Sequence, residues 1–526
     1  MRCRIYYLLA FAALGCSEKQ DDPLLPQNSQ GSDCPLAGPA FPAPSNLTNS
    51  PSLLDAALMF ETQLGNQTGG LLPNDTAWAV AVFSAKSGIL YERYHTPPID
   101  IGVKNVDQNS IFRLASVSKV FTVYTILSAI GDSRFNDPIT KYIPELANRI
   151  TYTRDIYDDI DNVNWEDITL NELASQTAGI ARDAFNLLAY ALEAITGKDL
   201  ETTMTESVFK KLGMAHSSYK DAPPIGGVIP GDPQTAGWAR DLGVDNPGGS
   251  LYMSTGDLVR AGQSILRSTL IKPAETRRWL QPKMLTGYPG AAVGAPWEIT
   301  YLQSANNRLI SYFSKDGDID AYHSSIVLSP EHEVGFTILV AGTADSNASL
   351  TRTFLKVGLV DIFMPAIEDR AKVEASLTFD GTYVDNLTNS TVVISAGFND
   401  HPGLTVRSLV SRGVPLVGPG TYTGGIMASQ FGVGNSTRLY PTTLKTVRNK
   451  VTAHGSYISR MGFRASFVPL VLPGTVQDPC ILDWANLDGI TYGRKALDDW
   501  VFEMSEEGLA TGLNIRMLDL NLRKVV

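Results

Sequence analysis

A serine and a lysine three residues apart are the clearest candidates for chemistry in this chain. Ser116-Val117-Ser118-Lys119 places a hydroxyl and an amine at positions i and i+3, which share one face of a helix. A nucleophilic serine needs a base within hydrogen-bonding reach, and a neutral amine can take its proton. At the start of a helix, free backbone N–H groups and the helix dipole favour negative charge. The spacing therefore predicts Ser116 as a nucleophile and Lys119 as its base.

The segment that follows Lys119 supports this interpretation. Residues 120–130 are apolar nearly all round, which is typical of a helix buried on every side. Burial disfavours the charged form of a lysine and lowers its pKa. The spacing alone is not specific, because Ser207-Val208-Phe209-Lys210 matches it too. That second pair lies in an amphipathic, charged helix, and we expect it to form a solvated helix face.

A second group of polar residues lies far downstream, in residues 312–318 (YFSKDGD). The β-prone start of this run predicts a strand that carries Lys315 and Gly317. The alternative is a charged surface turn, since Asp-Gly-Asp is typical of turns. His323 follows closely, and we expect it to be a hydrogen-bonded strand residue and not a member of the site.

The elements around these residues predict an α+β fold, in which helices pack on an antiparallel sheet. Apolar periodicity predicts helices at 53–64, 120–130, 187–196 and 202–212, a hairpin at 77–84 and 89–94, and strands at 309–314, 324–328 and 335–340. Near residue 370 the sequence changes to alternating β-prone runs with Gly and Asn turns, namely 391–395, 404–407 and 464–468. We therefore predict a catalytic domain over residues 53–370 and a separate β-rich C-terminal domain over 377–526.

The N-terminus predicts export. Residues 1–16 combine a basic start with an apolar stretch too short to span a bilayer, as in a signal peptide. A buried N-terminal helix and a lipid anchor on Cys16 are the alternatives. Residues 17–52 are rich in Pro, Ser, Gln and Asn and predict an extended arm that is not a packed element. No later segment has the length and apolarity of a membrane span, so we expect a secreted protein.

Cysteines and sequons agree with that compartment. Cys34 and Cys480 remain in the mature chain and would form a disulfide, with two free buried thiols as the alternative. We expect N-linked glycans at the N-x-[S/T] sequons, which are Asn46, Asn66, Asn74, Asn347, Asn386, Asn389 and Asn435.

Composition and motifs exclude several other classes. The net charge of −11 disfavours nucleic acid and anionic membranes as partners, because both attract Lys/Arg patches. The six histidines lack metal-binding spacing, and no phosphate-binding glycine loop is found, so we expect no metal and no cofactor. The chain has no G-x-S-x-G motif, which argues against an α/β-hydrolase.

Several motifs in one order carry a family resemblance. The strings FRLASVSKVFT, NELASQTAGI, GGSLYMSTGDL and SKDGDIDAYHSSIVLSPEHEVGFTILVAG resemble the serine β-lactamase-related and penicillin-binding family, above all its class C-like branch in secreted fungal proteins. The resemblance covers roughly residues 35–365, and the remainder resembles the β-domain appended to those fungal members. It implies the serine β-lactamase/penicillin-binding-type fold.

The resemblance also implies roles for the downstream strand. Lys315 would place a positive charge near a substrate carboxylate or near the base network, and Gly317 would let the backbone approach the substrate. The N–H groups of Asp318 and Ser116 would hold the oxyanion that forms during acyl transfer.

The sequence departs from the family at one motif. Members carry a Tyr-x-Asn whose tyrosine cooperates with the lysine, between the segment matching residues 175–180 and the next helix. Here that stretch is absent, and Phe185 follows almost at once. We expect Tyr190 to be a core residue. Tyr252, in a Tyr-x-Ser that the family has in addition to its catalytic tyrosine, is a remote substitute.

The sequence therefore predicts a serine hydrolase or acyltransferase that forms an acyl-enzyme on Ser116 from a small ester, amide or lactam. By analogy with some fungal relatives, the substrate would be a polyketide-type ester of secondary metabolism. The alternative is a non-catalytic binding protein on the same fold, because the tyrosine is missing. Either the coding sequence has lost an exon or the protein has lost activity.

Overall fold

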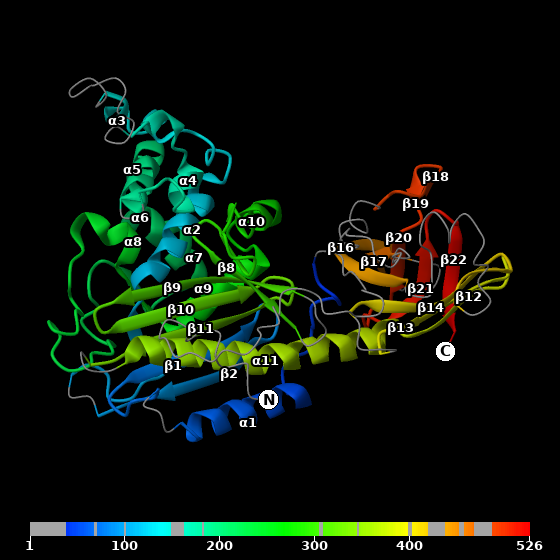
Figure 1. Cartoon of the computed structure of the whole chain (residues 1–526), viewed down its shortest axis with the longest axis horizontal. Coiled ribbons are helices and arrows are strands. Elements are labelled where there is room, and N and C mark those ends of the chain that lie inside the picture. The colour runs from blue at the N-terminus through cyan, green and yellow to red at the C-terminus, as the bar shows by residue number, and fades with distance from the viewer. Residues whose placement is uncertain are drawn as a thin grey trace, which may run out of the picture.

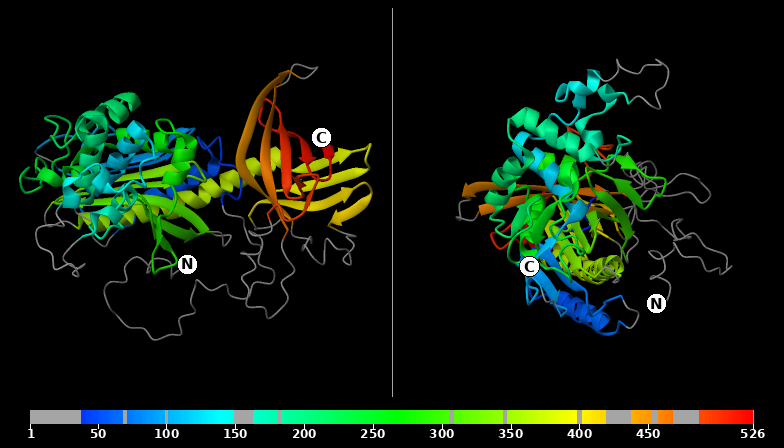
Figure 2. Two further views of the ribbon diagram at one scale, coloured as in Figure 1. Left: turned by 90° about the horizontal axis from the view of Figure 1, so that it is seen from above. Right: turned by 90° about the vertical axis from the view of Figure 1, so that its left-hand side faces the viewer.

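The structure is a computed structural model in which two regions have separate hydrophobic cores (Figure 1). Figure 2 shows the helix-rich region and the β-rich region side by side, joined by one long helix. The structure describes residues 38–67, 71–98, 101–148, 163–180, 183–304, 309–343, 347–397, 402–418, 437–451, 457–467 and 487–525.

An antiparallel sheet of eight strands organises the first region, in the order β2-β1-β11-β10-β9-β8-β7-β6. Strand β1 (Ala77–Ser84), which pairs with β2 and β11, is buried along its whole length. Alternate residues of β1 enter two different cores: Ala77, Ala79, Ala81 and Phe83 face one, and Trp78, Val80 and Val82 face the other. A strand covered on both faces needs apolar residues at every position, which explains the unbroken apolar run in the sequence.

The remaining strands of this sheet are β2 (Gly88–His95), β6 (Met284–Leu285), β7 (Ala291–Val293), β8 (Glu298–Gln303), β9 (Leu309–Ile319), β10 (Tyr322–Ser329) and β11 (Val334–Ala341). A smaller sheet has the order β3-β5-β4 and consists of β3 (Ile111–Arg113), β4 (Ser217–Tyr219) and β5 (Leu251–Ser254).

Helices cover both faces of the large sheet. One face carries α1 (Pro51–Gly65) and α11 (Ala348–Phe379), which share one core with that face of the sheet (Figure 1). Most of the other helices lie on the opposite face around the larger core. They are α2 (Ser118–Ile130), α3 (Glu145–Asn148), α4 (Leu170–Ala174), α5 (Ala184–Thr196), α6 (Leu200–Met204), α7 (Lys210–Leu212), α8 (Asn246–Gly249), α9 (Thr255–Arg267) and α10 (Pro273–Trp279). Short 3₁₀ and π turns are η2 (Ala115–Val117), η3 (Ile139–Lys141), η5 (Trp165–Asp167), η6 (Thr205–Phe209) and η7 (Gly243–Asp245).

The second region is a nine-stranded antiparallel sheet, and the pairing of β13 with both β12 and β14 closes most of it on itself. Its strands are β12 (Gly381–Asp385), β13 (Ser390–Ser395), β14 (Leu404–Ser411), β15 (Val414–Val417), β16 (Arg438–Val451), β17 (Tyr457–Ser466), β20 (Asp499–Met504), β21 (Ala510–Ile515) and β22 (Leu520–Val525), and a separate ribbon pairs β18 (Thr491–Tyr492) with β19 (Lys495–Ala496). The α+β fold with a β-rich C-terminal region is as the sequence predicts.

The connection between the regions differs from the expected break near residue 370. Helix α11 runs for 32 residues across that position. Its last turns enter the second core, where the Phe379 ring lies 5.2 Å from Phe463 and 4.8 Å from Phe502 between ring centroids. The helix therefore belongs to both cores. The change in composition near residue 370 did not show that one helix continues across that position.

The N-terminal arm is also more firmly packed than predicted. Residues 38–50 contain no helix or strand, but Phe41 is buried in the second core and Leu47 in the core beneath α11. The Glu374 carboxylate on α11 accepts hydrogen bonds from the backbone N–H groups of Ser45 and Asn46. The prediction that this segment is unpacked is therefore wrong for its last part.

Some expectations concern residues outside the described ranges. These are the signal peptide at 1–16, Cys16, the Cys34–Cys480 disulfide, and the sequon at Asn435. In the part of the chain that is described, no helix has the length and apolarity needed to cross a membrane.

Candidate functional site

Ser116 lies in a sharp turn between a short strand and a buried helix. β3 ends at Arg113, the 3₁₀ turn η2 carries Ser116, and α2 continues from Ser118. Ala115, just before the serine, has a φ of +47°, a left-handed conformation that costs about 1–3 kcal/mol in a residue with a side chain. The turn is held in place at Leu114, whose N–H donates to Leu251 and whose carbonyl accepts from the Ser324 hydroxyl at 2.6 Å.

The structure brings the predicted serine and lysine together. The Nζ atom of Lys119 lies 2.8 Å from the Oγ atom of Ser116. Ser116 lies in the 3₁₀ turn η2, and Lys119 lies in the first turn of α2. Side chains three residues apart stack in a 3₁₀ turn, so this geometry brings the serine and the lysine onto the same side. Nζ also lies 3.3 Å from the Gly248 carbonyl oxygen and 5.4 Å from the centre of the Phe185 ring. The amine thus has fixed partners on three sides.

Electrostatics favour a Lys119 amine that can lose its proton. Burial, and after it the positive charge of Lys315, lower the pKa of Lys119 to about 8. Glu298 and Asp245 act in the opposite direction. A lysine with this pKa is neutral in an appreciable fraction of molecules near neutral pH, so it can accept a proton from a hydroxyl.

Strand β9 runs alongside the Ser116 turn, so residues 312–318 lie in a strand and the alternative of a surface turn is wrong. Gly317 is the point of closest approach. A Cβ atom built on it would lie 2.9 Å from the Ser116 nitrogen and would collide with the Leu114 carbonyl oxygen. The glycine is therefore needed so that β9 can pack against the serine turn, a more direct reason than the expected approach to a substrate.

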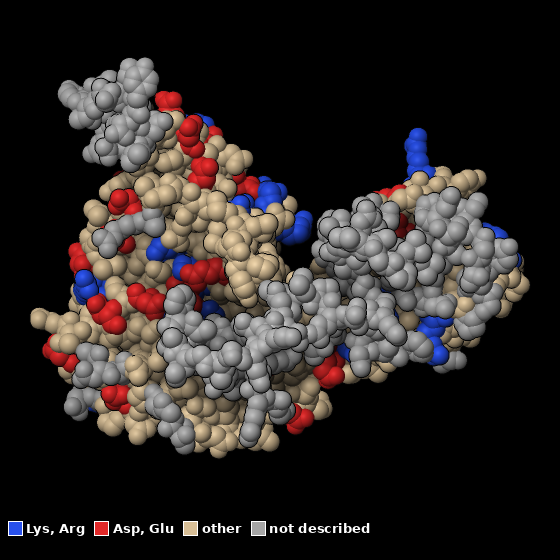
Figure 3. Space-filling model, viewed as in Figure 1, with Lys and Arg blue, Asp and Glu red and all other residues tan. Residues whose placement is uncertain are grey.

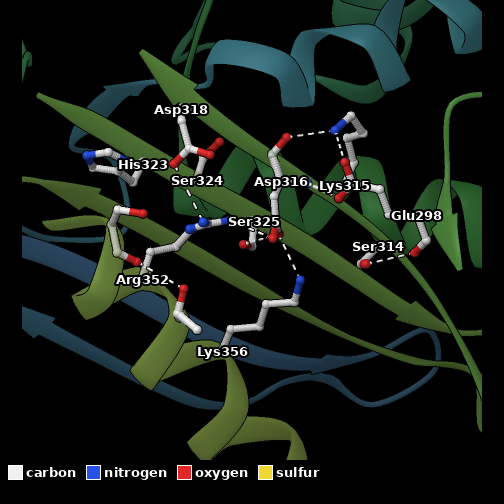
Figure 4. Close-up of polar contacts among 12 residues, drawn as sticks. Glu298, Ser314, Lys315, Asp316, Asp318, His323, Ser324, Ser325, Arg352 and Lys356 are labelled. Carbon is white, nitrogen blue, oxygen red and sulfur yellow. Dashed lines mark hydrogen bonds and ion pairs between the residues drawn. The ribbon is translucent and has the colours of Figure 1, made fainter. Parts of the chain in front are cut away.

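Lys315 lies on the serine side of β9 but is not a free cation. Its side chain is 7% exposed, and its ammonium pairs with the Glu298 carboxylate on β8 and donates to the Asp316 carbonyl at 2.9 Å. The second carboxylate oxygen of Glu298 accepts the Asp316 N–H at 3.0 Å. Figure 4 shows this Lys315–Glu298 contact at the edge of the polar network.

The opposite face of β9 carries a second set of charges, directed at α11 (Figure 4). Asp316 accepts from Lys356 at 2.8 Å and pairs with Arg352, and its neighbour Asp318 accepts from His323 at 2.6 Å. Burial alone would raise the pKa of Asp316, but Lys356 and Arg352 outweigh it and hold that pKa below its usual value. This network fixes β9 to α11 and thereby positions the strand that faces Ser116. His323 is a hydrogen-bonded residue of β10, as expected.

A cavity of about 330 Å³ opens at the serine–lysine pair. It is lined by Ala115, Ser116, Lys119, Gln176, Leu242, Asp245, Gly248, Gly249, Asp318 and Ile319. Asp318 thus shares the cavity with Ser116, where the resemblance places the two oxyanion donors. Gln176 has a φ of +59°, a second left-handed residue at the cavity wall.

The second serine–lysine pair does not form a site. Ser207 is 8% exposed and its hydroxyl donates to the Thr203 carbonyl at 2.6 Å, whereas Lys210 is exposed. The prediction of a solvated helix face is therefore right for Lys210 and wrong for Ser207. The π turn η6 changes the helical register here, so that Ser207 turns inward.

Tyr252, the remote substitute for the missing tyrosine, does not join the site, and Tyr190 does not line the cavity either. Tyr252 is fully buried and its hydroxyl donates to the Trp238 carbonyl, and it does not line the cavity. Tyr190 lies on α5 with half of its surface exposed, so the prediction that it is a core residue is wrong. Its position on α5 points away from the apolar face formed by Phe185, Leu188 and Leu192.

Sequence reasoning missed four residues that shape the site: Glu298, Asp245, Gly248 and Phe185. Phe185 and Gly248 contact the amine of Lys119, and the two carboxylates raise its pKa. None of these four residues belongs to a sequence motif whose spacing predicts a contact with Lys119. Only the position of Phe185 beside the missing tyrosine motif offered a signal.

Fold and site together define a class. An eight-stranded antiparallel sheet with helices on both faces, and a serine and lysine at the start of the buried helix, is the β-lactamase/penicillin-binding fold. The β-lactamase family model matches residues 79–357, and a model described as "Beta-lactamase-like-like, C-terminal domain" matches residues 371–526. The chain belongs to the β-lactamase family.

Relatives extend over both regions. A "Beta-lactamase-like protein" of Arthroderma benhamiae is 24% identical and covers 92% of this chain and 95% of its own length. A "Probable hydrolase M10" of Phoma sp. is 23% identical and covers 76% of this chain and 75% of its own length. Among solved structures, D-alanine carboxypeptidase AmpC from Burkholderia cenocepacia covers 60% of this chain and 99% of its own, with a TM-score of 0.44 and 17% identity. The hydrolase-named relatives support a hydrolase-type enzyme.

Proposed function

We propose that this protein is a serine hydrolase or acyltransferase that forms an acyl-enzyme on Ser116. One observation carries the proposal: Lys119 Nζ lies 2.8 Å from Ser116 Oγ at the wall of a solvent-reaching cavity. The lowered pKa of Lys119 adds to it, because a base must be able to exist without its proton.

The reaction has two steps. The neutral Lys119 amine takes the Ser116 proton while Oγ attacks the carbonyl carbon of an ester, amide or lactam. The N–H groups of Ser116 and Asp318 hold the oxyanion. The intermediate collapses, the bond to the leaving alcohol or amine breaks, and the Lys119 ammonium returns its proton to that group. Water or an alcohol then attacks the acyl carbon and gives its proton to Lys119. The bond from the acyl carbon to Oγ breaks, and the Lys119 ammonium returns that proton to Ser116, which restores both groups.

A fluorophosphonate probe tests the nucleophile, since it forms a covalent bond only with an activated serine. Wild-type protein and the Ser207→Ala variant should be labelled at Ser116, as located by peptide mass spectrometry. Ser116→Ala should not be labelled. Folded protein that shows no labelling dependent on Ser116 would count against catalysis.

A second candidate function is binding without catalysis, and the missing tyrosine motif favours it. Loss of a general acid/base costs about 10²–10⁴-fold in rate. The alignment with the Arthroderma protein extends over 589 positions, more than the length of this chain, so that relative has residues with no counterpart here. Transcript sequence around the codons for residues 181–183 discriminates: an exon encoding Tyr-Ser-Asn there would restore the enzyme hypothesis, and its absence would favour binding.

We also propose that the protein is exported and carries N-linked glycans. The sequon asparagines that the structure describes are all exposed, and these are Asn46, Asn66, Asn74, Asn347, Asn386 and Asn389. An endoglycosidase should lower the mass of the protein purified from a culture medium. Unchanged mass, or protein retained inside the cell, would contradict this proposal.

A further inference from the structure

The cations near Ser116 are already neutralised by carboxylates of the protein. Lys315 is buried and paired with Glu298. On the other face of β9, Arg352 and Lys356 are engaged by Asp316, and Arg352 lies 3.6 Å from Asp318 (Figure 4). A buried cation that already has a carboxylate partner offers little net attraction to a second anion.

The wall of the cavity adds negative charge. Among its lining residues, Lys119 is the cation and Asp245 is a carboxylic acid. The carboxylate of Asp318 is directed away from the serine, at His323 and Arg352. Lys119 must also give up its positive charge to act as a base. Beyond the cavity, Figure 3 shows acidic and basic side chains interspersed over the visible face of the larger region. An anionic ligand would therefore leave water for a site without a compensating charge, which is costly.

We propose that the cavity takes an uncharged acyl group, and that Glu298 and Asp245 select against substrates that carry a carboxylate. Glu298 does so by neutralising Lys315, and Asp245 by direct repulsion from the cavity wall. The substrate class is then a neutral ester or amide and not a carboxylate-bearing lactam or peptide. This inference rests on the proposed acyl transfer at Ser116.

Two esters with the same leaving group and six-carbon acyl chains test the selection. They are p-nitrophenyl hexanoate, which is neutral, and the mono-p-nitrophenyl ester of adipic acid, which ends in a carboxylate. After subtraction of the uncatalysed rates, wild-type protein should show a kcat/KM about tenfold higher for the hexanoate, the size expected for one uncompensated charge near a partly exposed site. Equal kcat/KM values, or a preference for the adipate ester, would overturn the inference.

Single charge removals locate the selection. Asp245→Asn and Glu298→Gln should each reduce the preference for the neutral ester by about fivefold. Glu193→Gln removes the same charge from an exposed site on α5 that does not line the cavity, and it should leave the preference unchanged. The readout is the ratio of the kcat/KM values for the two esters, so a loss of overall activity in a variant does not obscure the result. A ratio unchanged in both site variants would contradict the assignment.

Failure of the inference can be separated from failure of the proposed function. If neither ester is hydrolysed faster than by Ser116→Ala, the hydrolase proposal fails, and binding alone then decides the charge selection. Titration calorimetry should give tighter binding of phenylboronic acid than of 4-carboxyphenylboronic acid. Tighter binding of the carboxylated compound would overturn the inference.

Discussion

Two serine–lysine pairs with identical spacing lie in this molecule, and they have opposite environments. Ser116 lies in the 3₁₀ turn η2 and Lys119 in the first turn of the buried helix α2, and the two side chains contact each other and line a cavity. Ser207 and Lys210 lie in the π turn η6 and the following turn α7, where the serine bonds to its own helix and the lysine is exposed. The spacing therefore supplies proximity only when the local helical register stacks the two side chains.

The environment then decides whether proximity becomes reactivity. Burial, and after it the positive charge of Lys315, lower the pKa of the Lys119 amine to about 8. The hydroxyl of Ser207 is already committed to the Thr203 carbonyl. A serine–lysine pair becomes reactive when its amine is desolvated and its hydroxyl is not already bonded elsewhere. The four-residue pattern determines neither property.

The largest expected contrast is between the two serines. Ser116→Ala should lower kcat/KM for p-nitrophenyl hexanoate by at least about 10⁴-fold, because no nucleophile remains to form the acyl-enzyme. Ser207→Ala should leave kcat/KM within about twofold, since it removes only a bond within one helix. Circular dichroism of both variants verifies folding. Equal losses in the two variants would remove the distinction between the pairs.

The second-largest expected contrast is between substitutions of the two lysines. Lys119→Met keeps the length of the side chain and removes the base, so we expect kcat to fall by about 10²–10⁴-fold. Lys210→Met changes an exposed residue and should leave kcat unchanged. Single-turnover measurements of acylation give the relevant rate. If acylation survives in Lys119→Met, another group must take the serine proton.

The sequence predicted the elements of the first region well, because a strand or helix that is buried on both faces has apolar residues at nearly every position. The apolar run of β1 and the largely apolar residues 120–130 of α2 were recognised from residue type alone. β1 is buried along its length and α2 from Val120 to Leu127, whereas residues 128–130 are not fully buried. Helix α11 was missed because its apolar residues serve two cores in succession, so no single face stays apolar along its length.

The site was predictable only where a motif carries it. Ser116, Lys119, Lys315 and Gly317 followed from their patterns. Glu298 did not, because its contact with Lys315 depends on the pairing of β8 with β9, which places Glu298 opposite the residue that precedes Lys315. Pairing register between strands is a tertiary property, and one sequence without a turn of fixed length does not specify it.

The glycine of β9 gives a smaller contrast within the first region. Gly317→Ala places a methyl group against the backbone at Leu114 and Ser116, so β9 or the serine turn must move, and we expect kcat/KM to fall by about 10²-fold. Gly287→Ala is the control, because a Cβ atom there meets open space. Both variants should remain folded in thermal unfolding. An unaffected Gly317→Ala enzyme would show that the close approach does not matter for catalysis.

The pH dependence offers the finest test of what sets Lys119 apart. Only the neutral amine accepts a proton, so kcat/KM should rise about tenfold from pH 7 to pH 9, with a midpoint at about 8. Glu298 stabilises the ammonium form of Lys119, so Glu298→Gln should move the midpoint below 8. Lys210→Met should leave it in place. A midpoint that stays at 8 in Glu298→Gln would mean that burial and Lys315 alone govern the pKa of Lys119, and that the carboxylate acts on the site only through its pairing with Lys315.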